Sequence, residues 1–569
     1  MHISISQRRF RTVALIFLLL FVFCLSSLFY IQFFRSRYLS RIANQQHNLY
    51  VELEPLRGAL YDRNLKPLAI NLPCDSLYAC PRRIKNKEKA ISALREALGL
   101  EYSYLKGRIY RDKAFVWVAR KLSPEQVDRV KKLKIGGLGF VRESKRCYPN
   151  KNLASQVIGF AGLDNVGLDG LELFYDGYLK GASGWAQVLR DARQNKLLWQ
   201  KMILPKDGQE IILTIDEFVQ FVVEREIENT FRKFKAIGAT IVVMDPKTGE
   251  ILAMASRPGY DPNYPQGAGA DSRRNRALCD MFEPGSVFKI VTASAALEEG
   301  AFSESDRFFC ENGSYRVANH ILHDHHPHGW LTLSQVFAES SNIGTTKIAQ
   351  KMGAGTVYRY ARLFGFGESS GVDMPGEISG VLKEPGAWSK TSIGAVPIGQ
   401  EVGVTVMQLA GAVSAVANGG LLMKPFIVKA IQQRGGEIIK EFKPQEVRRV
   451  ISARTAERIK NILVLATEEG TGKLARVSDF KVGGKTGTAQ KIDPNGAYSH
   501  SKYIASFIGF APADEPLVAI VVMVDEPRPY YFGGVVAAPA FKRIASDVVR
   551  YLALRKDINA AGEIAKKAQ

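Results

Sequence analysis

The feature that most constrains this chain is an uncharged apolar run near its amino terminus. Residues 12–34 contain no charged side chain and are rich in Leu, Phe and Val. As an α-helix this run spans about 34 Å, enough to cross a hydrocarbon layer about 30 Å thick. It is too long for the core of a signal peptide, and it lacks a small-residue cleavage site. We therefore expect a cytoplasmic tail at residues 1–11 and one transmembrane helix at residues 12–34.

Charge does not orient this helix. Three arginines precede the run and three follow it: Arg8, Arg9 and Arg11, then Arg35, Arg37 and Arg41. The positive-inside comparison is therefore tied. Long downstream domains are translocated largely regardless of such charges, so the tie does not exclude export of the rest of the chain.

Length and composition indicate a globular protein of two or three domains. The 569 residues are 46% apolar and 23% charged. The formal net charge of +21 suits anionic partners, although an evenly spread basic surface explains it equally well. The basic clusters at 82–85 and 131–134 lack a zinc-finger or RNA-binding motif around them, so we predict no nucleic-acid partner.

Cysteine and histidine usage predicts no metal site. The six cysteines form no C-x-x-C pair with zinc spacing, although Cys74 and Cys80 could form a disulfide in an exported segment. Five of the eight histidines lie at 320–328. Pro327 and Gly329 interrupt regular ligand geometry there, which favours a polar loop over a metal centre.

Residues 36–205 alternate short apolar runs with turns and charged helical stretches. Residues 58–63 predict a short strand that enters a turn. A Ser-x-x-Gln capping pattern at Ser123 predicts a helix to about Leu133. No repeat and no catalytic group of residues is present, so we interpret this segment as an irregular α+β pedestal or dimerisation-like module that positions another domain.

A second domain is expected at residues 206–555. Thr214 and Glu217 form the expected capping box of an amphipathic helix. Two pairs of apolar strands are predicted, at 239–244, 251–255, 503–510 and 517–524. A helix is expected from about Ala538 to Leu554, followed by a frayed tail at 556–569. Strands at both ends with helices between them indicate an α+β fold in which helices cover one antiparallel sheet.

Ser286 and Lys289 are the first candidate catalytic pair. Pro284 and Gly285 punctuate the chain before an apolar run that predicts the start of a helix. Three residues apart on one helix, the two side chains lie on the same face. A serine hydroxyl attacks only once its proton is removed, and a lysine can remove that proton only when its amine is uncharged. Burial and a second nearby cation both lower the pKa of a lysine, so this state is attainable.

Two later segments provide partners for this serine. The chain reads Ser-Ser-Asn at 340–342 and Gly-Lys-Thr-Gly-Thr at 484–488. The second segment is not a phosphate loop, because the position six residues before Lys485 lacks the required glycine. In chain order, three motifs resemble those of the penicillin-binding and serine β-lactamase superfamily: Ser286-x-x-Lys289, Ser340-x-Asn342 and Lys485-Thr486-Gly487.

The resemblance extends to the amino-terminal part of the chain. Residues 57–64, 146–149 and 167–172 look like motifs of class B penicillin-binding proteins, and residues 533–539 are also similar to that class. The sequence departs from the family at Leu65, where Gly is usual, and at Cys147, where an aromatic residue is common. The resemblance implies a transpeptidase domain with neither metal nor cofactor.

The resemblance also implies roles for the motif residues. Ser286 would attack the carbonyl carbon of a D-alanyl-D-alanine stem peptide while Lys289 takes its proton. Ser340 would pass a proton to the departing D-alanine, and Asn342 would hold the substrate amide. Lys485 would hold Lys289 neutral and attract the terminal carboxylate of the substrate.

Substrate binding is assigned to Thr486, Gly487 and Thr488 by the same resemblance. The two threonine hydroxyls would contact the carboxylate, and the N–H groups of Ser286 and Thr488 would form the oxyanion hole. The amine of a second stem peptide would then attack the acyl-enzyme and form the cross-link.

Rival members of the superfamily fit less well. A β-lactamase is smaller and usually soluble, and a bifunctional enzyme needs a glycosyltransferase domain ahead of residue 205. A β-lactam sensor remains an alternative. Within class B, Asn342 favours the cell-division type, because the elongation type commonly has aspartate there.

The resemblance therefore implies a single-pass protein of the cytoplasmic membrane whose catalytic domain lies outside the cell. Its expected partners are peptidoglycan stem peptides, β-lactam antibiotics, a glycan polymerase and other division proteins.

Overall fold

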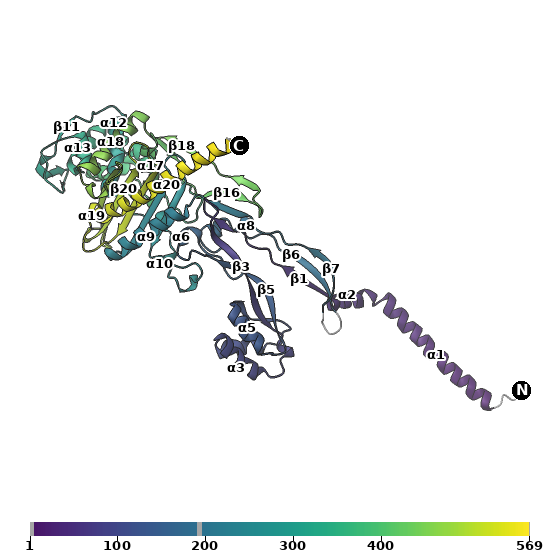
Figure 1. The fold of residues 1–569 in the computed structure, drawn as a ribbon. Coiled ribbons are helices and arrows are strands. Elements are labelled where there is room, and N and C mark those ends of the chain that lie inside the picture. Colours follow the sequence, from purple (N-terminus) through teal and green to yellow (C-terminus); the bar gives the residue numbers. More distant parts are fainter. Residues whose placement is uncertain (1–4, 191–195, 568–569) are drawn as a thin grey trace. The chain divides into compact units, whose positions relative to one another are not determined.

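The computed structural model describes residues 5–190 and 196–567 and divides the chain into two compact units. The first unit combines residues 1–56 with residues 181–207. The second combines residues 57–180 with residues 208–569 and holds every predicted catalytic residue. Figure 1 shows the elements of both units along the chain.

The first unit contains the expected apolar helix. Helix α1 spans Ile5–Phe33, and its segment Gln7–Phe33 is long and apolar enough to cross a membrane. None of its most apolar window is buried against protein, which is consistent with a single-pass membrane anchor. The helix begins before the predicted residue 12 and includes Arg8, Arg9 and Arg11, which precede the apolar run. Helix α2 (Ser36–His47) is followed by a three-stranded antiparallel sheet of β1 (Asn48–Leu53), β6 (Gly184–Arg190) and β7 (Lys196–Ile203).

The amino-terminal part of the second unit is an α+β module. Its strands are β2 (Leu60–Tyr61), β3 (Pro67–Ala79), β4 (Val116–Leu122) and β5 (Leu138–Cys147). Its helices are α3 (Lys87–Leu98), α4 (Tyr102–Ile109), α5 (Pro124–Lys132), α6 (Ser155–Ile158), α7 (Gly170–Phe174) and α8 (Asp176–Leu179). The predicted strand at 58–63 is confirmed as β2. The helix predicted at Ser123 is confirmed as α5, with both hydrogen bonds of its capping box present.

A second sheet ties this module to the following domain. Its strand order is β17-β16-β8-β2-β3-β4, with β5 paired to β3. The added strands are β8 (Glu210–Leu213), β16 (Val428–Gln432) and β17 (Ile438–Glu441). Strands β2 and β8 run parallel, with Leu60 opposite Ile211. This long-range pairing has no signature in either short strand, and the sequence did not predict it.

The three amino-terminal motifs meet in one buried ionic network. Arg57 and Arg146 each donate from Nε to Glu172, over 2.6 Å in both cases. Arg57 also donates to Asp176 over 2.6 Å, and the Tyr148 hydroxyl lies 3.2 Å from Glu172. Burial raises the pKa of Glu172, but the two arginines outweigh it and hold that pKa below its ordinary value. These three motifs therefore stabilise the amino-terminal module. They are distant in sequence from the catalytic motifs.

The catalytic domain is built on a five-stranded antiparallel sheet of order β10-β9-β21-β20-β19. The strands are β9 (Gly238–Met244), β10 (Ile251–Arg257), β19 (Gly483–Ile492), β20 (Tyr498–Ala511) and β21 (Val518–Asp525). Both predicted strand pairs are confirmed. Every residue of β9 and β10 is buried, because helices cover both faces of the sheet.

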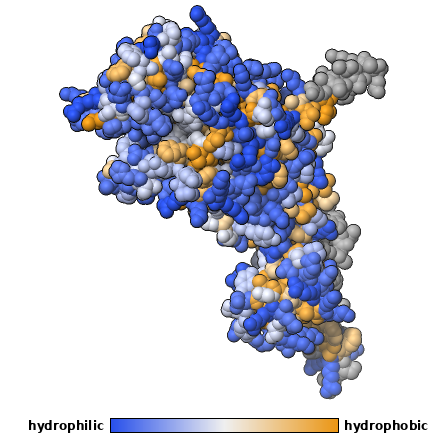
Figure 2. All heavy atoms as spheres, turned by 60° about the vertical axis from the view of Figure 1, so that its left-hand side comes forward, coloured by the Kyte–Doolittle hydropathy of each residue, from blue (hydrophilic) through white to orange (hydrophobic). Residues whose placement is uncertain are grey.

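Two hydrophobic cores lie on opposite faces of this sheet. One includes side chains of α9 (Glu217–Lys233) and α20 (Ala538–Lys567). The other includes side chains of α12 (Lys289–Glu298), α14 (Asn342–Met352), α17 (Val406–Ala417) and α18 (Ala453–Glu468). Hydrophilic residues dominate the molecular face in Figure 2, with smaller hydrophobic patches between them.

The remaining elements are short or peripheral. They are α10 (Ala270–Arg273), α11 (Arg276–Cys279), β11 (Arg307–Phe309), β12 (Ser314–Val317), β13 (His320–His323), β14 (Trp330–Thr332), α13 (Leu333–Ala338), α15 (Ala354–Leu363), α16 (Ser392–Ala395), β15 (Leu421–Met423), β18 (Glu446–Arg449) and α19 (Gly533–Val536).

The structure corrects two predicted helix ends. Helix α9 is capped by Asp216, whose side chain accepts from the N–H groups of Phe218 and Val219, and not by Thr214. The Thr214 hydroxyl instead donates to the Ile251 carbonyl over 2.7 Å. Helix α20 continues to Lys567 where a frayed tail was expected.

Cys74 and Cys80, which the sequence allows to form a disulfide, are not bonded to each other. Cys74 lies within the extended strand β3 and Cys80 directly follows it, and both are free. Six residues of extended chain separate two Cα atoms by about 20 Å, whereas a disulfide needs less than about 7 Å.

Candidate active site

Ser286 lies on a short turn that leads directly into a helix. Residues Gly285–Phe288 form the 3-10 turn η3, and α12 begins at Lys289. Gly285 has a φ of 57°, in the left-handed region that favours glycine, and its N–H donates to the Gly399 carbonyl over 3.0 Å. Val287 and Phe288 are fully buried, whereas Ser286 is partly exposed. The apolar neighbours therefore fix the turn in the core and leave the hydroxyl at the surface of the site.

Lys289 is buried and holds the second motif. Its Nζ donates to the Ser340 carbonyl over 2.6 Å and to Asn342 Oδ1 over 2.8 Å, and it lies 3.2 Å from Ser340 Oγ. Burial lowers the pKa of Lys289 well below its ordinary value, and the charge of Lys485 lowers it further. Asp324 opposes this shift. Burial is thus the leading cause of the lowered pKa of Lys289, and the charge of Lys485 adds to it.

A neutral Lys289 changes the direction of one hydrogen bond. A neutral amine has two N–H groups and one lone pair, which suffice for the Ser340 carbonyl, the Asn342 amide oxygen and one incoming O–H. Because a serine hydroxyl hydrogen rotates freely, Ser340 Oγ can donate to the amine. The site can therefore move a proton between Lys289 and Ser340.

Ser340 adopts a strained backbone conformation. Its φ is 61°, which is uncommon for a residue with a side chain. The next residue, Ser341, caps α14 by accepting from the Gly344 N–H over 2.9 Å. This turn aims both the carbonyl and the hydroxyl of Ser340 at Lys289. The strain therefore coincides with the contact that the chemistry requires.

Asp324 supports the second motif and was missed by the sequence analysis. Its carboxylate accepts from the N–H groups of Asn342 and Ile343 over 2.5 and 3.0 Å, and from the Ser341 hydroxyl over 2.6 Å. A carboxylate at a helix amino terminus is stabilised by the unpaired N–H groups and the helix dipole. Asp324 belongs to the histidine-rich segment at 320–328, which was interpreted from the sequence as a polar loop.

Asn342 is held at both ends of its amide. Oδ1 accepts from Lys289, and Nδ2 donates to the His323 carbonyl over 2.8 Å. The amide nitrogen carries a second N–H, which is the group that can serve a ligand.

Strand β19 forms the opposite wall of the site. Lys485 on this strand is 1% exposed, and its Nζ donates to the Thr486 carbonyl over 3.2 Å. Burial lowers the pKa of Lys485 to about 7. About half of the Lys485 amines are therefore protonated near neutral pH, and a bound carboxylate favours the charged form.

The other three residues of this motif have different environments. The Thr486 hydroxyl is buried and lies 2.8 Å from the Thr471 hydroxyl. Thr488 is partly exposed, and its hydroxyl accepts from the Gly533 N–H over 3.0 Å. A Cβ on Gly487 would lie 2.9 Å from Val287 Cγ1 and 3.0 Å from the Pro284 carbonyl oxygen. Glycine at 487 therefore lets β19 approach the serine-bearing turn.

Glu283 braces the same turn from the other side. Its Oε1 accepts from the Glu401 N–H over 2.9 Å and from the Tyr498 hydroxyl over 3.2 Å. Burial raises the pKa of Glu283 above its ordinary value, although the hydrogen bonds from the Glu401 N–H and the Tyr498 hydroxyl oppose this shift. Sequence reasoning missed this carboxyl, because its partners lie more than 100 residues away.

The structure thus brings the first two motifs into direct contact and places β19 beside them. Across residues 5–190 and 196–567, no group of three His, Cys, Asp or Glu side chains could hold a metal ion. Within the histidine-rich segment, His325 instead packs edge-on against Phe532, with ring centroids 5.8 Å apart.

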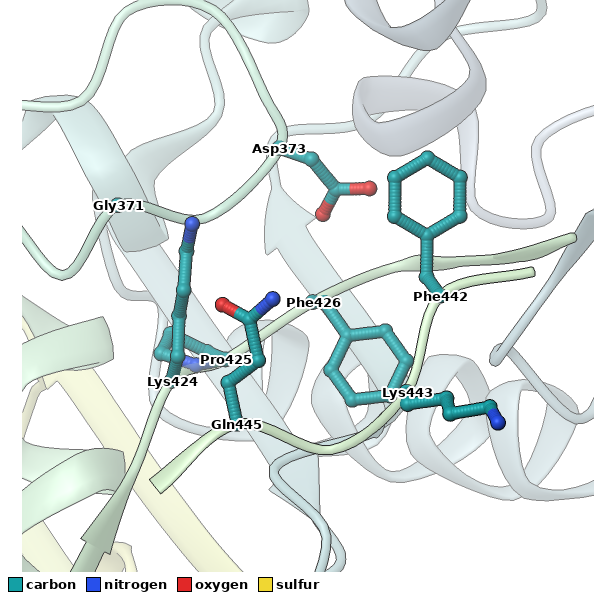
Figure 3. A pocket seen from close by; sticks show the side chains of 8 residues that line it. All are labelled: Gly371, Asp373, Lys424, Pro425, Phe426, Phe442, Lys443 and Gln445. Atoms are coloured by element: carbon teal, nitrogen blue, oxygen red, sulfur yellow. The ribbon is translucent and has the colours of Figure 1, made fainter. Parts of the chain in front are cut away.

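A separate pocket contains none of these residues (Figure 3). It has a volume of about 80 Å³ and is lined by Gly371, Asp373, Lys424, Pro425, Phe426, Phe442, Lys443 and Gln445. Its one carboxylate, Asp373, accepts from the N–H groups of Ile427 and Val428 and from the Tyr175 hydroxyl. These hydrogen bonds give Asp373 a structural role, so we assign no catalytic function to the pocket.

Comparison with known proteins agrees with this geometry. Residues 239–546 match the family described as the penicillin binding protein transpeptidase domain, and residues 52–213 match the penicillin-binding protein dimerisation domain. The chain is 35% identical to stage V sporulation protein D of Bacillus subtilis, over 99% of this chain and 88% of that protein. It is 36% identical to the probable peptidoglycan D,D-transpeptidase PenA of Neisseria meningitidis, over 88% of this chain and 85% of that protein.

A solved structure is similar over most of both chains. Penicillin binding protein 3 of Mycobacterium tuberculosis, in complex with aztreonam, superposes with a TM-score of 0.70 at 30% identity. The match covers 89% of this chain and 98% of that chain.

Proposed function

Because this chain belongs to the class B penicillin-binding proteins and is a peptidoglycan D,D-transpeptidase that binds β-lactams, we propose that Ser286 is its acylated nucleophile and Lys289 its base. The observation that supports these roles most strongly is the placement of Lys289. Lys289 lies three residues after Ser286, and its amine is buried and has a lowered pKa. The same amine contacts Ser340 and Asn342 of the second motif. A neutral amine at this place can accept the proton of Ser286.

The proposed first step forms an ester and releases D-alanine. Ser286 Oγ attacks the carbonyl carbon between the two D-alanine residues of a donor stem peptide, and its proton moves to Lys289 Nζ. The tetrahedral intermediate breaks its C–N bond, and the leaving amine takes a proton that passes through Ser340. The contact between Lys289 and the Ser340 hydroxyl supports this relay.

Substrate binding is proposed for the residues of the second and third motifs. Lys485 attracts the terminal carboxylate, with the hydroxyls of Thr486 and Thr488 beside it, and Gly487 keeps β19 close to the nucleophile. The second N–H of Asn342 Nδ2 donates to the substrate amide.

In the second step, the amine of an acceptor stem peptide attacks the ester carbonyl. The new amide is the cross-link, and Ser286 regains its proton. The N–H groups of Ser286 and Thr488 are proposed to stabilise the oxyanion in both steps.

The proposed role is septal wall synthesis, for which Asn342 is the supporting residue. We assign residues 1–11 to the cytoplasm, 12–34 to the membrane, 36–205 to the pedestal, 206–555 to the transpeptidase domain and 556–569 to a carboxyl-terminal segment. The substrate lies outside the cytoplasmic membrane, so the catalytic domain is placed there, next to a glycan polymerase and other division proteins.

Labelling with a fluorescent penicillin tests the chemical roles. Wild type should be labelled covalently, and Ser286→Ala should not be labelled while its circular dichroism spectrum is unchanged. Undiminished labelling of Ser286→Ala would reject the nucleophile. Rapid release of hydrolysed β-lactam would favour a hydrolase.

Depletion of the protein tests the cellular role. Filamentous cells are expected if it serves division. Rounded cells would favour the elongation type of transpeptidase.

A further inference from the structure

The positive charge of this protein is concentrated in one small part of the chain. Residues 80–135, called here the basic lobe, contain 16 Lys and Arg but only 6 Asp and Glu. This gives +10 of the total net charge of +21 within 56 of 569 residues. Composition alone leaves open that the net charge is spread evenly over the surface. This concentration of charge rules out that explanation.

The basic lobe is a folded substructure with its own core. Helices α3, α4 and α5 lie at one end of β3 and β5 (Figure 1). Buried apolar side chains of these helices pack on β3 and β4 in a hydrophobic cluster distinct from the two cores of the catalytic domain. Twelve of the basic residues are exposed: Arg82, Arg83, Lys85, Lys89, Arg95, Lys106, Arg111, Lys113, Arg129, Lys131, Lys132 and Lys134. The apolar interior thus holds the lobe rigid while its cations face solvent.

Few carboxylates compensate these cations. Within the lobe, Arg82 pairs with Asp112 over 2.8 Å. Glu88 accepts from the hydroxyls of Tyr102 and Tyr110. Exposed like charges on one small body repel each other, and an anionic partner relieves that repulsion.

The exposed large apolar side chains of the lobe are aromatic. They are Tyr102, Tyr104, Tyr110 and Phe115, between 37% and 48% exposed. Cations lie over several of these rings: Lys106 over Tyr102, Arg108 over Tyr104 and Lys87 over Tyr110, at 5.1–5.7 Å from the ring centroids. A helix that binds a membrane surface carries a continuous apolar face of Trp, Phe or Leu beside its cations. In the lobe, Phe115 is the one exposed side chain of these three types, and it lies outside α3, α4 and α5, so the chemistry favours a polar polymer over a lipid surface.

We propose that the basic lobe binds peptidoglycan strands at a site separate from the active site. The inference rests on the proposed function, because it takes the polymer that the enzyme cross-links as the partner. Stem peptides repeat a free carboxylate along the strand, which matches the exposed lysines and arginines. Sugar rings provide flat faces for the exposed tyrosines. Many weak contacts along one polymer add up through high effective concentration, although each exposed ion pair is weak alone.

Sedimentation with purified insoluble peptidoglycan tests this binding. The full-length protein is held in phosphatidylcholine nanodiscs, and Ser286 is first acylated with penicillin so that the active site does not contribute. Wild type should sediment with peptidoglycan at low salt, and its affinity should fall at least tenfold between about 50 and 300 mM salt, since exposed charges are screened over about 8–10 Å near 0.1–0.15 M ionic strength.

Two variants with the same change in net charge distinguish an effect of the lobe from an effect of net charge. The lobe variant carries Lys85→Glu, Lys89→Glu, Lys113→Glu and Lys132→Glu. The control carries Lys383→Glu, Lys440→Glu, Lys443→Glu and Lys481→Glu, four exposed lysines of the catalytic domain. The lobe variant should bind at least tenfold more weakly than wild type, and the control within about twofold of it. Equal loss in both variants, or no loss in either, would overturn the proposal.

A second variant keeps the test valid if the charge reversals disturb folding. Tyr104→Ser leaves the net charge unchanged and removes an exposed ring, so it should weaken the binding that persists at high salt. Unchanged binding by Tyr104→Ser, together with salt-independent binding by wild type, would refute the lobe as the site.

The competing partner is an anionic membrane. If wild type binds vesicles of phosphatidylglycerol more tightly than peptidoglycan, and the lobe variant loses that binding, the lobe is a lipid site and the proposal fails. Penicillin labelling is measured in every variant before the assay. Loss of labelling in unmodified wild type would reject the proposed transpeptidase chemistry, whereas loss of sedimentation with labelling intact would reject only the lobe.

Discussion

Replacing Glu172 with alanine is expected to destabilise the protein strongly. Glu172 has no exposed side-chain surface and pairs with two buried guanidinium groups, those of Arg57 and Arg146, each over 2.6 Å. Breaking a buried ion pair costs about 3–5 kcal/mol, because the remaining charge stays buried without its partner. Asp176 still pairs with Arg57 in the variant, so we expect about 4 kcal/mol and not twice the cost of one pair. That is a large part of a typical stability of about 5–15 kcal/mol.

The assay is urea unfolding of the full-length protein followed by tryptophan fluorescence, with Asp164→Ala as the control. The Asp164 side chain is 76% exposed and pairs with Arg120, so its loss should cost less than about 1 kcal/mol. If Glu172→Ala costs no more than Asp164→Ala, the buried network does not hold the module together and the reasoning is refuted.

The same residue predicts a dependence on pH. The folded-state pKa of Glu172 lies below the ordinary value of a glutamate. Its contribution to stability is therefore present at neutral pH and is lost as the pH falls through the folded-state pKa. Glu172→Gln should remove this part of the loss of stability in acid. An identical acid profile for wild type and Glu172→Gln, measured by the same urea unfolding, would contradict the assigned charge state.

Three further predictions concern single positions. Leu65→Gly should stabilise the protein by about 0.5–1 kcal/mol, because the φ of Leu65 is 64°. The free energy that a left-handed backbone costs a leucine is larger than the free energy that glycine costs through the greater entropy of the unfolded chain. A lower stability of the variant in urea unfolding would contradict this. Gly487→Ala should slow penicillin labelling at least about tenfold, whereas Gly177→Ala, whose new methyl group meets no atom within 4 Å, should not; equal labelling rates would contradict the close packing of β19. Lys485→Gln should lower the acylation rate constant about 100-fold at pH 6, because it removes a cation proposed to bind the ligand carboxylate. The wild-type rate should fall toward the variant's as Lys485 loses its proton above about pH 7, and a constant ratio between pH 6 and 9 would argue against that role.

Elements with local signals were predicted well. The strands β9, β10, β20 and β21 contain segments of mainly apolar residues, which suit a sheet that helices bury on both faces. The helix at Ser123 was predicted because the capping box is a local pattern of four residues. The serine motif was recognisable because two further motifs, at 340–342 and 485–487, follow it in chain order.

Elements that depend on distant partners were not predicted. Asp324 contacts the second motif from 17–19 residues away, and Glu283 contacts Tyr498 from 215 residues away. Thr214 was predicted as the helix cap from its local pattern with Glu217, whereas Asp216 is the cap and the Thr214 hydroxyl donates to the carbonyl of Ile251 in β10. Leu65 departs from the glycine usual in its family, and its positive φ gives a physical reason for that usage.

The most direct test of the central claim is to identify the residue that penicillin acylates. Full-length protein is treated with benzylpenicillin, digested, and examined by tandem mass spectrometry. The account predicts one modified peptide, with the added mass on Ser286, and no such adduct when Lys289 is replaced by alanine. A stoichiometric adduct on Ser340 or on any other serine, with Ser286 unmodified, would contradict it.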